Sequence, residues 1–95
     1  MATELARTTL ECTKSMGFGA LPAVGSVFDG HIYTPQTSQG FPPSPYPSQI
    51  IDSREYFVTV RVVEVLGRPR LRTVIVEVSW GDRSQVTLST RMIDV

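Results

Sequence analysis

The first sixteen residues repeat apolar and charged side chains with the period of an α-helix. At 100° per residue, the apolar side chains of residues 2–16 gather on one side, where Leu5, Leu10 and Met16 are the largest. Gly17 follows, and glycine readily takes the left-handed conformation that ends many helices. The sequence therefore predicts an amphipathic helix over residues 2–16 with one face suited to a protein core.

The opposite side of this helix carries four charged side chains whose signs alternate along the chain. We call this set the charged stripe: Glu4, Arg7, Glu11 and Lys14. Because the apolar face must pack on the protein, the stripe is expected to point outward as a candidate contact surface for other subunits. A solvated face without a partner is the alternative interpretation. A stripe this polar does not drive association alone, so the sequence predicts a monomeric domain.

From residue 55 onward the apolar period changes to two, which is typical of strands with one buried face. Turns predicted at 67–70 and 81–84 divide this region into three runs. The apolar positions of the three runs are Val58, Val60 and Val62; Val74, Val76, Val78 and Trp80; and Val86, Leu88 and Met92. Three such strands joined by short loops predict an antiparallel meander with a single apolar face.

That apolar face needs a cover, and the amphipathic helix is the candidate for it. The predicted fold class is α+β, with the N-terminal helix packed on an antiparallel β-meander. A chain of 95 residues makes one domain, divided into a helix (1–17), a Pro/Gly-rich loop region (18–54) and antiparallel strands (55–95). The expected core anchors are Leu5, Leu10, Met16, Val76, Val78 and Trp80.

Residues 18–54 lack a regular apolar period. Six of the seven prolines lie here, and the stretch between Asp29 and Asp52 contains no Asp, Glu, Lys or Arg. A short strand or hairpin is predicted around 26–34, where apolar residues flank Asp29-Gly30.

The proline-rich run at 34–49 is predicted to be a loop, since proline fixes φ and lacks the N–H of a ladder hydrogen bond. We expect it to lie over the sheet with Phe41 and Tyr46 as anchors, and to be the most mobile or the most partner-dependent part of the domain. Its prolines at 42–45 also fit a polyproline docking motif, which is the alternative interpretation.

Composition and charge argue against catalysis and against nucleic acid. Nine basic and nine acidic residues give a net charge of zero, which provides no bulk attraction to nucleic acid or anionic lipid. In a meander, consecutive turns lie at opposite ends of the sheet, so Arg83 is separated from Arg68 and Arg70. No pair of carboxylates, phosphate-binding loop or activated nucleophile is evident, and no catalytic residue, cofactor or metal site is predicted.

Cysteine and histidine occur once each, as Cys12 and His31. One cysteine excludes an internal disulfide, and one histidine excludes a metal cluster built from His and Cys. Cys12 is expected to be a buried small apolar residue, and His31 a loop or strand-edge side chain. Among metals, calcium is the least disfavoured, because Asp29 and Asp52 bound an oxygen-rich loop.

Two stretches of the sequence resemble type IV pilin-like proteins. The first is Ala2-x-x-Leu5-Ala6-x-x-x-Leu10-Glu11 followed by Gly17-Phe18-x-x-Leu21-Pro22, which is similar to the second half of the long pilin helix. The second is Val76-x-Val78-Ser79-Trp80-x-Asp82-Arg83 with Val86-Thr87-Leu88-Ser89-Thr90, which resembles the last hairpin of that group. V-type minor pilins and I-type pseudopilins of type II secretion are the most similar members.

The resemblance implies a structural subunit of a bacterial filament rather than an enzyme. A minor pilin would help to initiate a type IV pilus or lie at its tip, with other pilin subunits as partners. The alternatives are a minor pseudopilin of a secretion system and a DNA-uptake pilus component, and zero net charge disfavours the latter. The resemblance also implies a hydrophobic helix ahead of residue 2 as the membrane contact, and residence in the inner membrane before assembly into a periplasmic or extracellular filament.

Overall fold

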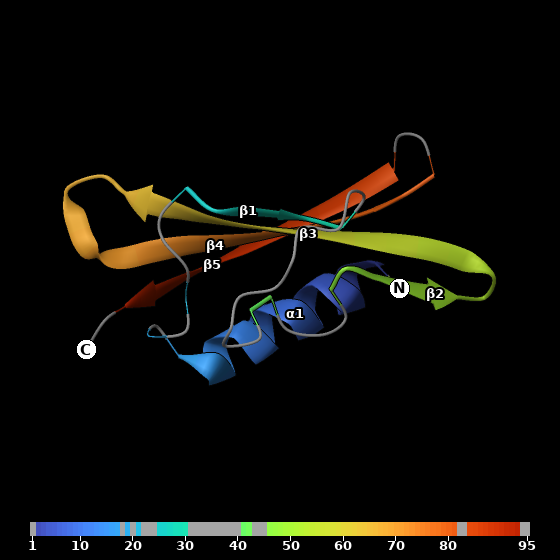
Figure 1. Cartoon of the computed structure of the whole chain (residues 1–95), viewed down its shortest axis with the longest axis horizontal. Coiled ribbons are helices and arrows are strands. Elements are labelled where there is room, and N and C mark those ends of the chain that lie inside the picture. Colours follow the sequence, from blue (N-terminus) through green and yellow to red (C-terminus); the bar gives the residue numbers. More distant parts are fainter. Residues whose placement is uncertain are drawn as a thin grey trace.

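In the part of the chain that the structure describes, one helix and five antiparallel strands form two layers (Figure 1). The computed structural model describes residues 2–17, 19, 21, 25–30, 41–42, 46–81 and 84–93. The elements in chain order are α1 (Ala2–Met16), β1 (Val27–Asp29), β2 (Ser48–Ile51), β3 (Arg54–Val65), β4 (Arg68–Trp80) and β5 (Ser84–Ile93). The predicted α+β class, with a helix packed on an antiparallel sheet, is confirmed.

The sheet has the strand order β1-β3-β4-β5, and β2 pairs with another part of β3. Strands β3, β4 and β5 form the predicted meander. The register of β3 and β4 places Val58 opposite Val78, and two further valine pairs follow along the same strands. All six of these valines are fully buried, because alternation puts them on the one face that the helix covers.

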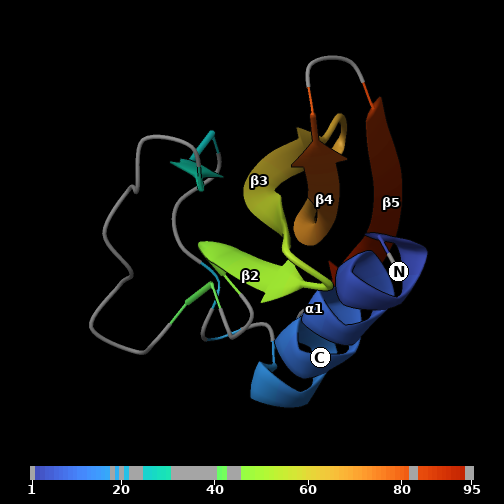
Figure 2. The ribbon, with the colours of Figure 1, turned by 90° about the vertical axis from the view of Figure 1, so that its right-hand side faces the viewer.

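Helix α1 packs across β4 and β5 (Figure 2). Its buried residues are Ala2, Leu5, Ala6, Thr9, Leu10 and Thr13. Two of them are polar, and both satisfy their hydroxyls within the helix. Thr9 donates to the carbonyl oxygen of Leu5 at 3.0 Å, and Thr13 donates to that of Thr9 at 2.8 Å. Buried threonines therefore join the apolar face without leaving an unpaired hydroxyl.

The turn predicted at 67–70 is shorter in the structure. The chain reverses over Leu66-Gly67 alone, and Val65 lies opposite Arg68, so β4 already begins at Arg68. Gly67 has a φ of 76°, a conformation that glycine adopts without steric penalty. Arg70 therefore lies in a strand rather than in a turn.

A second correction concerns the loop region assigned to 18–54, because it contains two strands. β1 falls within the strand or hairpin predicted at 26–34, of which residues 31–34 lie outside the described part of the chain. β2 was not predicted, and it pairs with β3 across a two-residue turn. Asp52 and Ser53 form that turn with φ values of 50° and 65°, the left-handed pair that suits the twist of a tight hairpin.

Three described residues of the run at 34–49 lie in the core, whereas Gln49 is exposed, and the expected mobility of the run stays a prediction. Phe41 and Tyr46 are buried, as their predicted role as anchors requires, and both rings meet Phe28 edge to face at centroid distances of 5.5 and 6.4 Å. Pro42 is also fully buried, so it is not free to join an exposed polyproline motif. Residues 34–40 and 43–45 lie outside the described part.

The expected core anchors divide into two groups. Leu5, Leu10, Val76 and Val78 are buried. Met16 and Trp80 are only half-buried and pack at the margin of the core, because each lies at the end of its element. Trp80 stacks at a tilt on Tyr56, with ring centroids 5.6 Å apart.

Replacing Trp80 by alanine should therefore lower the free energy of unfolding by about 2 kcal/mol, roughly half the cost of removing a fully buried aromatic ring. For a domain of this size the melting temperature should fall by about 8–16 °C. Thermal denaturation followed by circular dichroism measures the change. A melting temperature unchanged within error would mean that the indole makes no stabilising contact with Tyr56.

Candidate functional site

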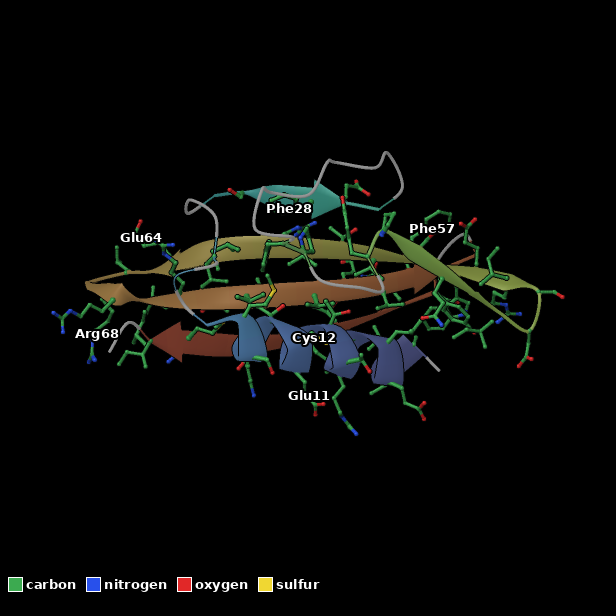
Figure 3. The ribbon with its side chains drawn as sticks, turned by 60° about the horizontal axis from the view of Figure 1, so that its bottom comes forward. Glu11, Cys12, Phe28, Phe57, Glu64 and Arg68 are labelled. Carbon is green, nitrogen blue, oxygen red and sulfur yellow. The ribbon has the colours of Figure 1, made fainter. Side chains whose placement is uncertain are left out.

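The charged stripe is the candidate site that the sequence predicts most directly. Its four residues are all exposed and lie on the face of α1 opposite the buried one. Figure 3 shows Glu11 on the side of the helix that is turned away from the sheet. Successive members are three or four residues apart, so they form a single line along the helix.

The order of the charges also stabilises the helix itself. Glu4 lies in the first turn and Lys14 in the last, where each complements the helix dipole. Arg7 and Glu11 are an exposed i,i+4 pair, and such pairs contribute about 0.3–0.5 kcal/mol. Because these contributions are small, substitutions in the stripe should not unfold the domain.

A shallow cavity of about 340 Å³ lies at the end of the β3–β4 hairpin. It is lined by Gly67, Arg68, Arg70, Leu71 and Ile93. Figure 3 shows Arg68 at this end of the sheet, beyond the end of the helix. The described residues of the lining include no nucleophile and no general base for acid–base or covalent catalysis. Arg83 lies outside the described residues.

The residues considered for metal binding are not brought together. Within the described ranges, no three of the His, Cys, Asp and Glu side chains lie close enough to share an ion. Asp29 ends β1, whereas Asp52 lies in the β2–β3 turn. Cys12 is a free thiol, half-buried rather than buried as expected, and His31 lies outside the described part.

One surface that the sequence pattern did not predict is the outer edge of β5. In the part of the chain that the structure describes, β5 pairs with β4 alone. Figure 2 shows α1 beneath this same edge of the sheet. The predicted meander already indicated such an edge, because its last strand is unpaired on one side unless another segment covers it. The position of this edge beside the helix could not be predicted, because it depends on tertiary packing.

No helix in the described ranges is long and apolar enough to cross a membrane. Comparison with models of known protein families, with curated proteins and with solved structures found no match to this chain.

Proposed function

We propose that this chain is a non-enzymatic structural subunit, a minor pilin that contributes to the initiation or the tip of a type IV pilus. The observation that carries the proposal is the placement of α1. One face of the helix is buried on an antiparallel sheet, and the other exposes the charged stripe along its length. A helix presented in this way suits contacts with neighbouring subunits.

The two stretches that resemble pilins also lie against each other. Leu5 and Leu10 from the first stretch are buried in the same core as Val76 and Val78 from the second. α1 contacts both β4 and β5, the strands that carry the second stretch. Two separate sequence similarities that form one packed unit support a shared fold, because each stretch supplies the surface that the other must cover.

In this proposal the helix continues from a preceding hydrophobic segment, which anchors the subunit in the inner membrane and later lies at the filament's centre. The charged stripe then faces adjacent subunits in the pilus. Complementary charges at such an interface fix orientation and register more than they add affinity. The alternating signs of the stripe favour one relative position of two subunits over its neighbours.

The test exchanges two charges of the stripe in the full-length protein expressed in its host. Arg7→Glu combined with Glu11→Arg keeps the net charge and an i,i+4 pair of opposite sign, so the melting temperature of the domain should change by less than about 2 °C. Surface pili counted by electron microscopy should decrease. A loss of secretion with normal piliation would instead identify a pseudopilin.

A matched control exchanges a pair of exposed charges outside the helix. Arg54→Glu with Glu55→Arg also keeps the net charge, at exposed positions beside the β2–β3 turn, and should leave piliation normal. Its one further change is the loss of the exposed hydrogen bond that the Ser48 hydroxyl donates to Glu55. Normal pili and normal secretion with the stripe exchanged would remove the stripe from the assembly interface. Equal defects in both variants would attribute the effect to general surface charge.

A further inference from the structure

The hydrogen bonds of β3 determine which way the backbone of β5 points. Val58 donates its N–H to the carbonyl oxygen of Pro47 at 2.9 Å, and Val62 donates to that of Ser26 at 3.1 Å. The backbone N–H and C=O groups of even-numbered residues of β3 therefore point away from β4. Because bonding direction alternates along an antiparallel strand, odd-numbered residues of β3 bond to β4, and even-numbered residues of β4 bond to β5.

The same alternation gives the free edge. Even-numbered residues of β5 lie opposite the even-numbered residues of β4 and bond to them. The odd-numbered residues direct their N–H and C=O groups outward, away from the sheet. These residues are Gln85, Thr87, Ser89, Arg91 and Ile93. Ten residues of strand thus present a regular row of backbone donors and acceptors along the edge beside α1.

This edge lacks the features by which proteins usually prevent strand addition. Such features are proline, lysine, inward-pointing charge, a bulge or a very short strand. β5 contains no proline and no lysine, its register with β4 is unbroken, and Arg91 is its single charged residue. An edge of this kind is a template for another strand.

We propose that the edge pairs with β5 of a second copy of this chain, antiparallel about a two-fold axis that passes Ser89. In this register Ser89 lies opposite Ser89 of the second copy, Thr87 opposite Arg91, and Gln85 opposite Ile93. All five outward residues of each copy then make ladder hydrogen bonds. Registers centred on neighbouring residues use fewer of them.

The side chains of the covered face fit the same register. Val86 lies opposite Met92 of the second copy, and Leu88 lies opposite Thr90. Val86 and Leu88 are half-buried in one copy and pack at the margin of its core. Pairing would join the two cores into one continuous apolar layer beneath a sheet that runs through both copies. No two like charges face each other across the new pair of strands.

The register itself identifies a second copy as the occupant, because a β5 strand that pairs with itself about Ser89 uses every outward backbone group of both copies. α1 contacts β4 and β5 and exposes the charged stripe on the face turned away from the sheet, so the stripe does not lie between the two copies.

This inference is independent of the proposed function. The sequence predicts a monomer from the charged stripe alone, which is too polar to drive association by itself. The structure adds backbone hydrogen bonds and half-buried apolar side chains. The dimer is therefore expected to form through β5, and the register about Ser89 sets its antiparallel orientation.

Crosslinking tests the register directly. In a Cys12→Ser background, Ser89→Cys would place two thiols on opposed residues whose Cα atoms are about 5.5 Å apart, within disulfide range. Thr87→Cys is the matched control, since residues 87 of the two copies would be about 14 Å apart. Mild oxidation should give a disulfide-linked dimer with Ser89→Cys and at least about tenfold less with Thr87→Cys. Equal yields from the two variants would overturn the register.

Sedimentation velocity tests the edge without a new thiol. As the protein concentration increases, the average mass of the wild-type domain should rise toward that of a dimer. Ser89→Pro removes an outward N–H and should weaken dimerisation at least about tenfold. Ile50→Pro is the matched control, because Ile50 also points its N–H away from β3 but lies on β2. A wild-type domain that stays monomeric at near-millimolar concentration would overturn the proposal.

Discussion

Replacing Phe41 by alanine should destabilise the domain by about 3–5 kcal/mol, the usual result of removing a fully buried aromatic ring. Phe41 is 0 % exposed, and its ring meets that of Phe28 at 70° with centroids 5.5 Å apart. The substitution would remove this edge-to-face contact and leave a cavity between the sheet and the proline-rich segment. Because small domains are stable by only about 5–15 kcal/mol, a large part of the total would be lost. Urea denaturation measures the difference.

Two controls separate this loss of packing from a general sensitivity of the segment. Phe41→Leu keeps a large apolar side chain and should cost much less than alanine. Gln49→Ala changes an exposed side chain of β2 and should alter the free energy of unfolding by less than about 0.5 kcal/mol. A loss below about 1 kcal/mol in Phe41→Ala would place the ring outside the core.

The helix and the three long strands could be predicted because each buries a single face. A regular face requires a regular period, and the positions of Leu5, Leu10 and the strand valines display it without knowledge of the fold. Thr13 shows the limit of this reasoning. It is fully buried on the same face, but its type gives no apolar signal, and only the hydroxyl bond to the helix backbone makes its burial acceptable.

The proline-rich segment could not be predicted in the same way. Phe41 and Tyr46 are held by edge-to-face contacts with Phe28, and no periodic pattern records contacts between isolated aromatic residues. β2 is only four residues long and follows Pro47 directly, so its strand character depends on pairing with β3. In both cases the determining interaction joins residues that are distant in sequence.

The candidate surfaces show the same division. The charged stripe follows from the helical period alone, since the face opposite a buried one must be exposed. The open edge of β5 depends on the order of strands and on which strands the helix covers. The cavity beside Arg68 depends on a hairpin turn two residues long, where the sequence predicted four. Surfaces built from one element are therefore predictable, and surfaces shared by several are not.

Replacing Gly30 by alanine should destabilise the domain by about 3 kcal/mol or more, at the upper end of the effect of overpacking. Gly30 follows β1 and is buried. A Cβ added there would overlap the carbonyl oxygen of Pro47 and would lie 2.5 Å from that of Val58. These atoms belong to the backbone and are tied to each other by the hydrogen bond from Val58 N–H to Pro47, so they cannot move aside as a flexible side chain would.

The matched control is Gly19→Ala, because a Cβ at Gly19 meets no atom within 4 Å. Its free energy of unfolding should remain within about 0.5 kcal/mol of wild type. Hydrogen exchange adds a local readout, since Gly30→Ala should weaken protection of the Val58 amide before that of the β4 valines, which lie further from the overlap. If Gly30→Ala instead melts at the wild-type temperature, the residue after β1 and the residue before β2 do not meet against β3, and the packing of the proline-rich segment must be different.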